Sequence, residues 1–173
     1  MAVGAAQDGW KLVAARDSDF HHLMTWFDDA PSVKVWGGPK FRYPYTAESF
    51  RADCYWGRMA SYRLESPEGE FAAFGQLYKR YGRINLARLI AHPHMRGQGV
   101  GKRLVSLLLE VGPKLVESNE FSLFVYHDNL PALACYKAMG FVISDHPEGA
   151  SMANQCYYLT RPVLSTTTIR GRS

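Results

Sequence analysis

Long apolar runs, paired cysteines and a strong charge imbalance are all missing from this chain of 173 residues. Its three cysteines include no Cys-x-x-Cys pair and no Cys/His set with zinc-like spacing, so we expect neither a disulfide framework nor a metal site. No segment has the roughly 18 uncharged apolar residues of a membrane span. The first residues also lack the charged and apolar stretches of a secretory signal. We therefore expect a cytoplasmic protein with reduced cysteines and no membrane partner.

What is present predicts a single globular domain. The chain is 47% hydrophobic and 21% charged, with a formal net charge of +4, and its length suits one domain with a proper core. We expect a flexible N-terminus over 1–9, one domain over 10–162 and a flexible tail over 163–173. Seven basic residues gather around one glycine-rich stretch: Lys79, Arg80, Arg83, Arg88, Arg96, Lys102 and Arg103. A phosphate-rich ligand and a solvated basic face explain this gathering equally well.

The order of apolar patterns along the chain predicts an α+β fold. Apolar residues at helical spacing follow possible caps at 17–19, which predicts a first helix. Residues 28–45 are expected to form a long ordered loop, and Thr46 is expected to cap a short helix that ends at about 54. The helix that starts near Gly99 meets Pro113, which would kink it or end it at Val111. A further helix is expected over 129–139. Strands are expected over 10–16, 61–64, 71–78, up to about 91, 121–126, 141–144 and 155–160.

The stretch from Ile84 to Lys102 reads as a strand, a glycine-rich turn and a helix. Such a turn leaves backbone N–H groups unpaired at a helix N-terminus, where an anion can reach them. A dinucleotide fingerprint would need glycine at position 102, which is Lys102. A P-loop would need glycine at 96 and serine or threonine at 103, and both residues are arginine. The stretch therefore predicts a phosphate cradle of another kind.

Two motifs in this region carry a resemblance to a known family. Residues 96–101, Arg-Gly-Gln-Gly-Val-Gly, are similar to the Gln/Arg-x-x-Gly-x-Gly/Ala signature of the GNAT-type N-acetyltransferases. About 30 residues later, the family's Asn-x-x-Ala-x-x-x-Tyr-x-x-x-Gly-Phe pattern is matched by Asn129, Ala132, Tyr136, Gly140 and Phe141. With the flanking elements, the resemblance covers about 10 to 162.

The resemblance implies a fold and a co-substrate. The fold would be a GNAT-like mixed, largely antiparallel central sheet flanked by helices in three αβα layers. The co-substrate would be acetyl-CoA, with no metal. Its pyrophosphate would lie on the glycine turn, and its pantetheine would pair with the end of the preceding strand, where an N–H polarises the thioester carbonyl. The implied coenzyme-binding residues are Leu89, Ile90, Ala91, Arg96, Gly97, Gln98, Gly99, Val100, Gly101, Lys102, Asn129 and Tyr136.

Two of these residues have alternative interpretations. The family role of Tyr136 is catalytic: its protonated hydroxyl assists departure of the coenzyme A thiolate. In an arbitrary helix the same residue would be a core aromatic with a satisfied hydroxyl. Asn129 binds the coenzyme or, equally well, caps the helix that follows it, with Pro131 in the first turn.

The general base is the point at which the sequence departs from the family. Many members carry a glutamate in the strand before the turn, and that position is Ala87 here. His127 is a weak candidate in its place, and Asp28 and Asp29 lie in the loop expected to face the acceptor.

The resemblance implies transfer of an acetyl group to a primary amine of a small molecule or peptide, by a monomer or homodimer. The alternative is a coenzyme A-binding sensor or scaffold without catalysis. No signature of nucleic-acid binding is present. The acceptor, the general base, the acyl range and the oligomeric state remain open.

Overall fold

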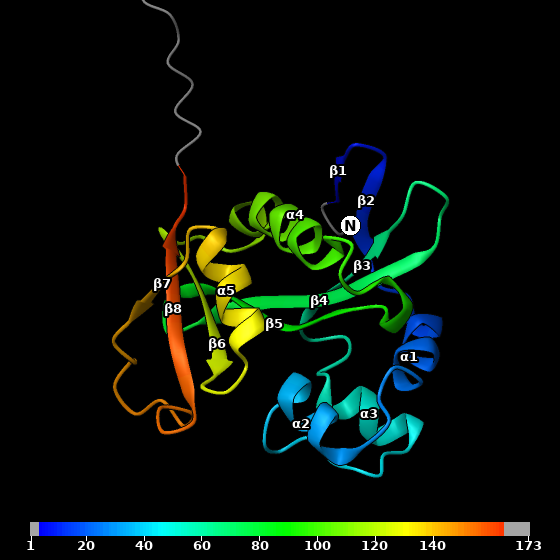
Figure 1. Cartoon of the computed structure of the whole chain (residues 1–173), viewed down its shortest axis with the longest axis horizontal. Coiled ribbons are helices and arrows are strands. Elements are labelled where there is room, and N and C mark those ends of the chain that lie inside the picture. Colours follow the sequence, from blue (N-terminus) through cyan, green and yellow to red (C-terminus); the bar gives the residue numbers. More distant parts are fainter. Residues whose placement is uncertain (1–3, 165–173) are drawn as a thin grey trace, which may run out of the picture.

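One eight-stranded sheet runs through the whole molecule and separates two groups of helices (Figure 1). The computed structural model describes residues 4–164, and its strand order is β1-β2-β3-β4-β5-β6-β8-β7. All neighbouring strands are antiparallel except β5 and β6, which are parallel. The predicted mixed, largely antiparallel sheet and its α+β class are confirmed. The strands are β1 (Ala5–Gln7), β2 (Trp10–Ala14), β3 (Ala60–Glu65), β4 (Phe71–Arg80), β5 (Arg83–Ala91), β6 (Glu120–Tyr126), β7 (Val142–Ser144) and β8 (Cys156–Pro162).

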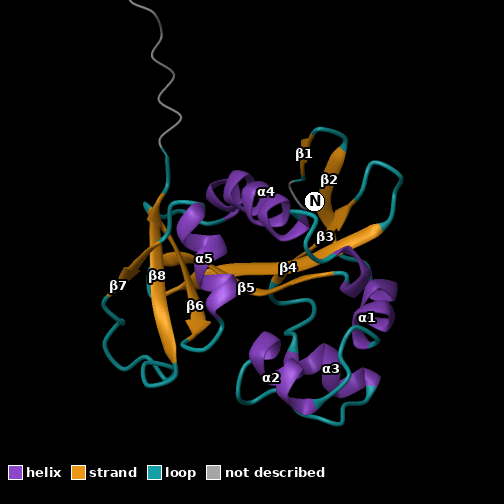
Figure 2. Cartoon of the chain, viewed as in Figure 1, coloured by secondary structure: helices purple, strands orange, loops and turns teal. Residues whose placement is uncertain are grey.

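The helices form the two outer layers (Figure 2). They are α1 (Asp17–Met24), α2 (Ala30–Gly37), α3 (Ala47–Asp53), α4 (Val100–Leu115) and α5 (Leu130–Ala138), with a short 3₁₀ turn at Pro93–Met95. α4 and α5 lie on one face, and α1, α2 and α3 lie on the other. The predicted αβα layering is therefore present.

The two faces of the sheet carry different cores. The α4 face is mainly aliphatic and includes Leu86, Leu104 and Leu108. The opposite face is aromatic, and Phe50 of α3 is buried there, with its ring stacked on Trp36 of α2 at 5.7 Å between centroids. Aromatic rings bury a large apolar area per residue, so three helices of seven or eight residues still cover this face.

One prediction for this region is wrong. The sequence predicts a loop throughout 28–45, whereas residues Ala30–Gly37 form α2. The helix begins after Asp29, whose carboxylate accepts a hydrogen bond from the Ser32 amide at 2.8 Å. The β-branched, aromatic and glycine residues of α2 have low helix propensity, so the sequence does not predict this helix. Packing of Val33 and Trp36 into the aromatic core stabilises the helix instead.

Other boundaries differ from expectation in smaller ways. β1 lies inside the segment 1–9 that we assigned to a flexible N-terminus, and it pairs with β2. The expected tail over 163–173 lies outside the described residues except for its first two positions. α4 continues past Pro113 to Leu115 rather than ending at Val111. Over residues 4–164, no helix combines the length and the apolarity needed to span a membrane.

Candidate active site

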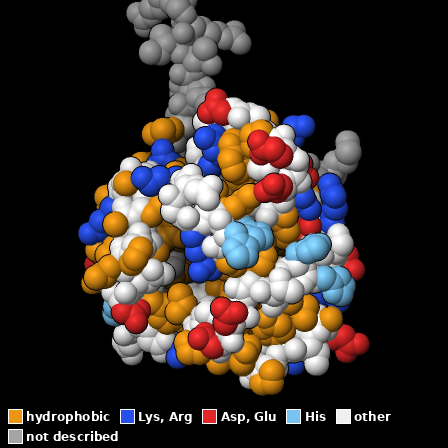
Figure 3. Space-filling view, turned by 45° about the vertical axis from the view of Figure 1, so that its right-hand side comes forward, with side chains coloured by type: hydrophobic (Ala, Val, Ile, Leu, Met, Phe, Trp, Pro, Cys, Tyr) orange, Lys and Arg blue, Asp and Glu red, His pale blue; other side chains and the backbone are white. Residues whose placement is uncertain are grey.

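The parallel strands β5 and β6 separate soon after they begin. Their paired register contains only Ile84 with Phe121 and Asn85 with Ser122. Beyond these pairs, a cleft of about 890 Å³ opens between the two strands, with α2 and α5 contributing to its walls. In the space-filling view a hollow is visible near the middle of the face, with Lys or Arg side chains at its wall (Figure 3).

A β-bulge in β5 accompanies this separation. Phe74 pairs with Ile90 and Gln76 with Ala87, so two residues of β5 lie opposite the single residue Gly75 of β4. One of the two is Arg88, whose φ of 51° is left-handed. A bulge bends the strand that carries it. β5 therefore turns away from β6 at the position where the cleft begins.

Gly75 is required for this arrangement. A Cβ atom at Gly75 would lie 2.9 Å from Leu89 Cδ2 and 3.0 Å from Leu108 Cδ1. Both distances are too short for unstrained carbon contacts. The missing side chain therefore lets α4 pack closely against the bulge.

The end of β5 offers an unpaired backbone edge to the cleft. Ile90 and Ala91 pair with β4 on one side, while the paired register with β6 ends at Asn85. Leu89, Ile90 and Ala91 all line the cleft. The structure thus places the predicted pantetheine-binding strand end on the cleft wall.

The glycine-rich turn is exposed and made largely of backbone. Gly97 and Gly99 have left-handed φ angles of 79° and 77°, and Gly99 is the N-cap of α4. A Cβ atom added at Gly97, Gly99 or Gly101 would meet no atom within 4 Å in the described structure. The first helical hydrogen bond runs from the Arg103 amide to the Gly99 carbonyl at 3.1 Å. The amides of the preceding residues, 100–102, therefore have no partner inside the helix and are suited to binding an anion.

The basic residues do not gather at the turn as the sequence suggests. Arg83 donates to Glu120 at 3.2 Å, on the side of the sheet away from α4. The Arg103 guanidinium lies over the Trp10 ring at 5.2 Å. Arg96 is exposed and lines the cleft, so it remains available to a phosphate group at this end.

The second motif lies on the opposite wall. Tyr136 of α5 lines the cleft, and its ring packs edge-to-face against Phe141 at 6.1 Å between centroids. Burial, with a smaller contribution from Cys135, raises the pKa of the Tyr136 hydroxyl well above its usual range. The group therefore stays protonated at neutral pH and remains a proton donor.

Asn129 combines the two interpretations given above. Its Oδ1 accepts a hydrogen bond from the Ala132 amide at 3.4 Å, which caps α5. The residue also lines the cleft. Capping is therefore present, and coenzyme contact by the same residue stays a prediction.

The described residues of the cleft contain no evident general base. Ala87 lines the cleft at the position where the family carries glutamate. Asp29 is the one carboxylate on the described cleft wall, and hydrogen bonds from Ser32 lower its pKa, which makes it a weaker base. His127 is exposed, packs against Tyr157 at 4.6 Å between ring centroids, and does not line the cleft.

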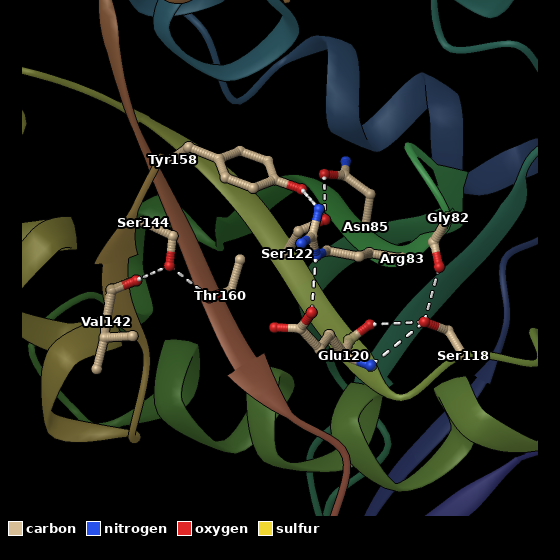
Figure 4. Close-up of polar contacts among 10 residues, drawn as sticks. All are labelled: Gly82, Arg83, Asn85, Ser118, Glu120, Ser122, Val142, Ser144, Tyr158 and Thr160. Atoms are coloured by element: carbon tan, nitrogen blue, oxygen red, sulfur yellow. Dashed lines mark hydrogen bonds and ion pairs between the residues drawn. The ribbon is translucent and has the colours of Figure 1, made fainter. Parts of the chain in front are cut away.

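A polar layer supports the sheet on the side away from α4 (Figure 4). Ser122 donates to Asn85 Oδ1 at 3.1 Å, and both residues are buried. Arg83 donates to the Tyr158 hydroxyl at 3.3 Å as well as to Glu120. Because Asn85 lines the cleft, this network fixes part of the cleft wall at the point where β5 and β6 diverge.

Several cleft residues were not named individually by the sequence reasoning, although the segment 28–45, which contains α2, was expected to face the acceptor. They come from α2, from the end of β4, from the bulge, from β6 and from the loop before β8, and they include Trp36, Tyr78, Arg80, Arg88, Phe124 and Met152. The sequence signal that could have revealed α2 was its start, where Asp29 is a typical N-cap residue and Pro31 suits the first turn of a helix. The strand residues could have been found from period-2 alternation only if the bulge had been known. Within residues 4–164, no group of three or more His, Cys, Asp or Glu side chains is arranged to hold a metal ion.

Comparison with known proteins gives a consistent family match. The model of the "Acetyltransferase (GNAT) family" matches residues 20–141. An N-acetyltransferase 9-like protein of Nematostella vectensis is 27% identical over 86 residues, which cover 50% of this chain and 43% of that protein. A probable spermine N(1)-acetyltransferase of Bacillus subtilis subsp. natto is 25% identical over 95 residues, which cover 51% of this chain and 62% of that protein. The chain thus spans about half the length of the curated relatives it matches.

A solved structure matches over nearly the whole chain. The spermidine N-acetyltransferase of Vibrio cholerae, in complex with CoA and spermine, superimposes with a TM-score of 0.69 at 14% identity. The match covers 90% of this chain and 96% of that one. At this identity the likeness shows a shared fold.

Proposed function

Because the chain belongs to the GNAT acetyltransferase family, we propose that it transfers an acetyl group from acetyl-CoA to a primary amine by direct attack. The observation that carries this proposal is that three features come together at one cleft. The glycine turn directly follows the cleft residue Arg96, and the unpaired end of β5 and the partly buried Tyr136 line the cleft. Each corresponds to one part of the thioester: the pyrophosphate, the pantetheine with its carbonyl, and the sulfur.

Binding of the coenzyme uses backbone groups. The pyrophosphate lies against the free amides at the start of α4, where the helix dipole also favours negative charge. Arg96 adds a cation at the same end. The pantetheine runs along 89–91, and one N–H of this edge polarises the thioester carbonyl.

The chemical step needs no covalent intermediate on the protein. The amine nitrogen bonds to the carbonyl carbon as the carbon–sulfur bond breaks. Tyr136 supplies a proton to the leaving sulfur. The nitrogen releases one proton to solvent and solvent returns one proton to Tyr136, so the number of protons on the protein is unchanged. Tyr136 carries its proton throughout the neutral range, and its raised pKa makes it a weaker acid than an ordinary tyrosine.

The alternative, a coenzyme A-binding sensor without catalysis, is favoured by one observation. The cleft wall has Ala87 where a glutamate base is usual, and the described residues around it supply no clear substitute. A sensor needs the glycine turn but not the acid at Tyr136.

Two measurements on the same sample separate these functions. Calorimetric titration with acetyl-CoA tests binding, and release of free thiol across a panel of amines and peptides tests transfer. Binding with thiol release for at least one amine supports the enzyme. Binding with no release across the panel would support the sensor, and no binding would contradict both.

A further inference from the structure

Two guanidinium groups line the cleft on the side away from α4, and neither has an acidic partner. They belong to Arg88 of the bulge and Arg80 at the end of β4. Among residues 4–164, no carboxylate oxygen lies within 4.0 Å of either group. Both lie away from the phosphate turn, where Arg96 is the cation on the cleft wall.

Neutral groups hold the Arg88 guanidinium in place. Its Nη1 donates to Gln76 Oε1 at 3.1 Å. Gln76 is itself fixed by hydrogen bonds from Nε2 to the Cys54 carbonyl at 2.7 Å and to the Ser61 hydroxyl at 2.8 Å. The Tyr55 ring lies 5.4 Å from the guanidinium carbon. The cation is therefore positioned before any ligand arrives.

One donor of this group is unused. Arg88 Nε is buried and has no hydrogen-bond partner among the described residues. A buried donor without a partner costs free energy, which a shift of the guanidinium toward a bound oxygen would recover. Arginine presents its N–H groups as a planar fork that matches the two oxygens of a carboxylate.

One acid that feels the charge of Arg88 is already occupied. Asp53 accepts hydrogen bonds from the Arg42 side chain, the closer at 2.9 Å. Burial acts to raise the pKa of the Asp53 carboxyl, but these bonds and the charge of Arg42, with a smaller effect of Arg88, bring it below the usual range. Arg88 therefore contributes to the field at Asp53 without being paired to it.

Arg80 is arranged in a similar way. Its Nη1 donates to the Tyr78 hydroxyl at 3.2 Å, and its guanidinium lies over the Phe124 ring at 4.6 Å. The one carboxylate on the described cleft wall, Asp29, is engaged in capping α2. Away from the coenzyme phosphates, the cleft thus holds two cations against one acid.

We propose that the acceptor is an amine that also bears a carboxylate, such as an amino acid or a short peptide, and that Arg88 binds this carboxylate. This inference rests on the proposed acetyl transfer. The proposed acceptor carries a negative charge besides its amine, whereas a polyamine carries further positive charges. Those additional ammonium groups would be repelled by Arg88 and Arg80.

The same cations bear on the missing base. A guanidinium near the acceptor disfavours the charged ammonium form and so lowers the pKa of the amine. A larger fraction of the bound acceptor is then neutral and able to attack. Arg88 would thus bind the carboxylate of the acceptor and also reduce the need for a general base at position 87.

Binding provides a test that does not depend on turnover. The probes are N-acetylated amino acids and their carboxamides, titrated calorimetrically into the CoA-loaded protein over a panel of side chains. We expect at least one acid to bind roughly 10- to 100-fold more tightly than its amide, as for one charge-assisted contact. If no acid in the panel binds more tightly than its amide, the proposal is wrong.

Variants assign the effect to a residue. Arg88→Gln should remove most of the difference between acid and amide, while Arg88→Lys should keep part of it through charge alone. Arg16→Gln is the matched control, because that side chain is 65% exposed and does not line the cleft. An acid preference that survives Arg88→Gln and Arg80→Gln, in proteins that melt as the wild type does, would remove both arginines from the site.

Turnover gives the second readout. Matched pairs of amino acid and decarboxylated amine, with spermidine as the polyamine, are compared by thiol release from acetyl-CoA. We expect kcat/KM to be about tenfold or more higher for the acid-bearing member of the preferred pair. Preference for spermidine or the decarboxylated amines would overturn the acid site while leaving acetyl transfer intact. Acid binding without thiol release from any amine would instead contradict the proposed function alone.

Discussion

The two ends of the cleft are built from different parts of the protein. The end proposed to bind the coenzyme, here called the coenzyme end, consists of main-chain groups, namely the amides at the start of α4 next to the cleft and the free edge of β5. The acceptor end consists of side chains from α2, β4, the bulge and β6, including Arg88 and Arg80. A backbone site requires glycine at fixed positions but tolerates variation around them. A side-chain site requires only that suitable residues reach it from whichever element lies nearby.

This difference fits the chemistry of the two proposed ligands. A pyrophosphate and a pantetheine are the same in every acetyl-CoA, so a fixed backbone arrangement binds them. Acceptors differ in charge and shape, and side chains are the part of the site that substitution alters without changing the fold. Four changes test this division between the two ends.

Tyr136→Phe should have the largest effect, because Tyr136 acts where the two ends meet. The ring remains and only the hydroxyl is lost, so turnover should fall roughly 10²- to 10⁴-fold, as for loss of a general acid. Affinity for acetyl-CoA should change little. Steady-state thiol release and calorimetry measure the two quantities. Turnover within a factor of two of wild type would make Tyr136 a packing residue.

Gly101→Glu tests the backbone end without disturbing the fold. A side chain at this position meets no described atom within 4 Å, and an acid in the first turn favours the helix dipole. Against a pyrophosphate, one added charge at about 4 Å costs roughly 4 kcal/mol at an effective dielectric constant near 20, or about a thousandfold in affinity. The neutral variant Gly101→Gln is the control.

Thermal melting with and without acetyl-CoA measures this effect. A ligand at about 100 times its Kd stabilises the folded state by roughly 2.7 kcal/mol. That stabilisation should vanish in Gly101→Glu and persist largely in Gly101→Gln. An equal loss in both variants would indicate crowding rather than charge repulsion.

The pH profile distinguishes an installed base from a free amine. If no side chain takes the proton, kcat/KM should rise about tenfold per pH unit toward the pKa of the acceptor itself, near 10.4 for an alkylamine. Because burial raises the pKa of Tyr136, its protonated form persists above pH 10 and should add no falling limb there. A plateau that begins well below the pKa of the acceptor and disappears in His127→Ala would assign the base to His127 instead.

Gly75→Ala should have the smallest effect and should act on stability. Its Cβ atom would overlap Leu89 and Leu108, and overpacking of this kind typically costs about 1–3 kcal/mol. Gly101→Ala has open space, and the gain in helix propensity should stabilise the protein by up to about 1 kcal/mol. Urea unfolding of the two variants gives the comparison. Equal stabilities would mean that α4 does not pack as closely on the bulge as described.

The coenzyme end could be predicted from the sequence because its requirements appear as residue spacing. Glycines at 97, 99 and 101 between an apolar strand and a helix indicate an anion-binding turn whatever the rest of the fold. Asn129 and Tyr136 stand at fixed positions in the helix that follows β6. Most element boundaries follow in the same way from local patterns, whereas the arrangement of the sheet was implied by the family resemblance.

The acceptor end could not be predicted because its requirements are not local. The basic residues from 79 to 103 are close in sequence, yet strand alternation and side-chain contacts direct them to different places. Arg83 pairs with Glu120, and Arg88 enters the cleft only because of the bulge. α2 has weak helix propensity and is held by tertiary packing of Val33 and Trp36, which no local pattern reveals.

The bulge in β5 also shifts the alternation of side chains along the strand by one residue. Before it, Ile84 and Leu86 face α4; after it, Leu89 and Ala91 do. Even positions therefore give way to odd ones at Arg88. If the same residues formed a regular strand without the bulge, strict alternation would turn Arg88 and Ile90 toward α4 and Leu89 away from it. Deleting Arg88 would instead keep Leu89 facing α4 and Ile90 facing away. One extra residue thus lets a continuous strand supply an aliphatic face to the core and an arginine to the cleft.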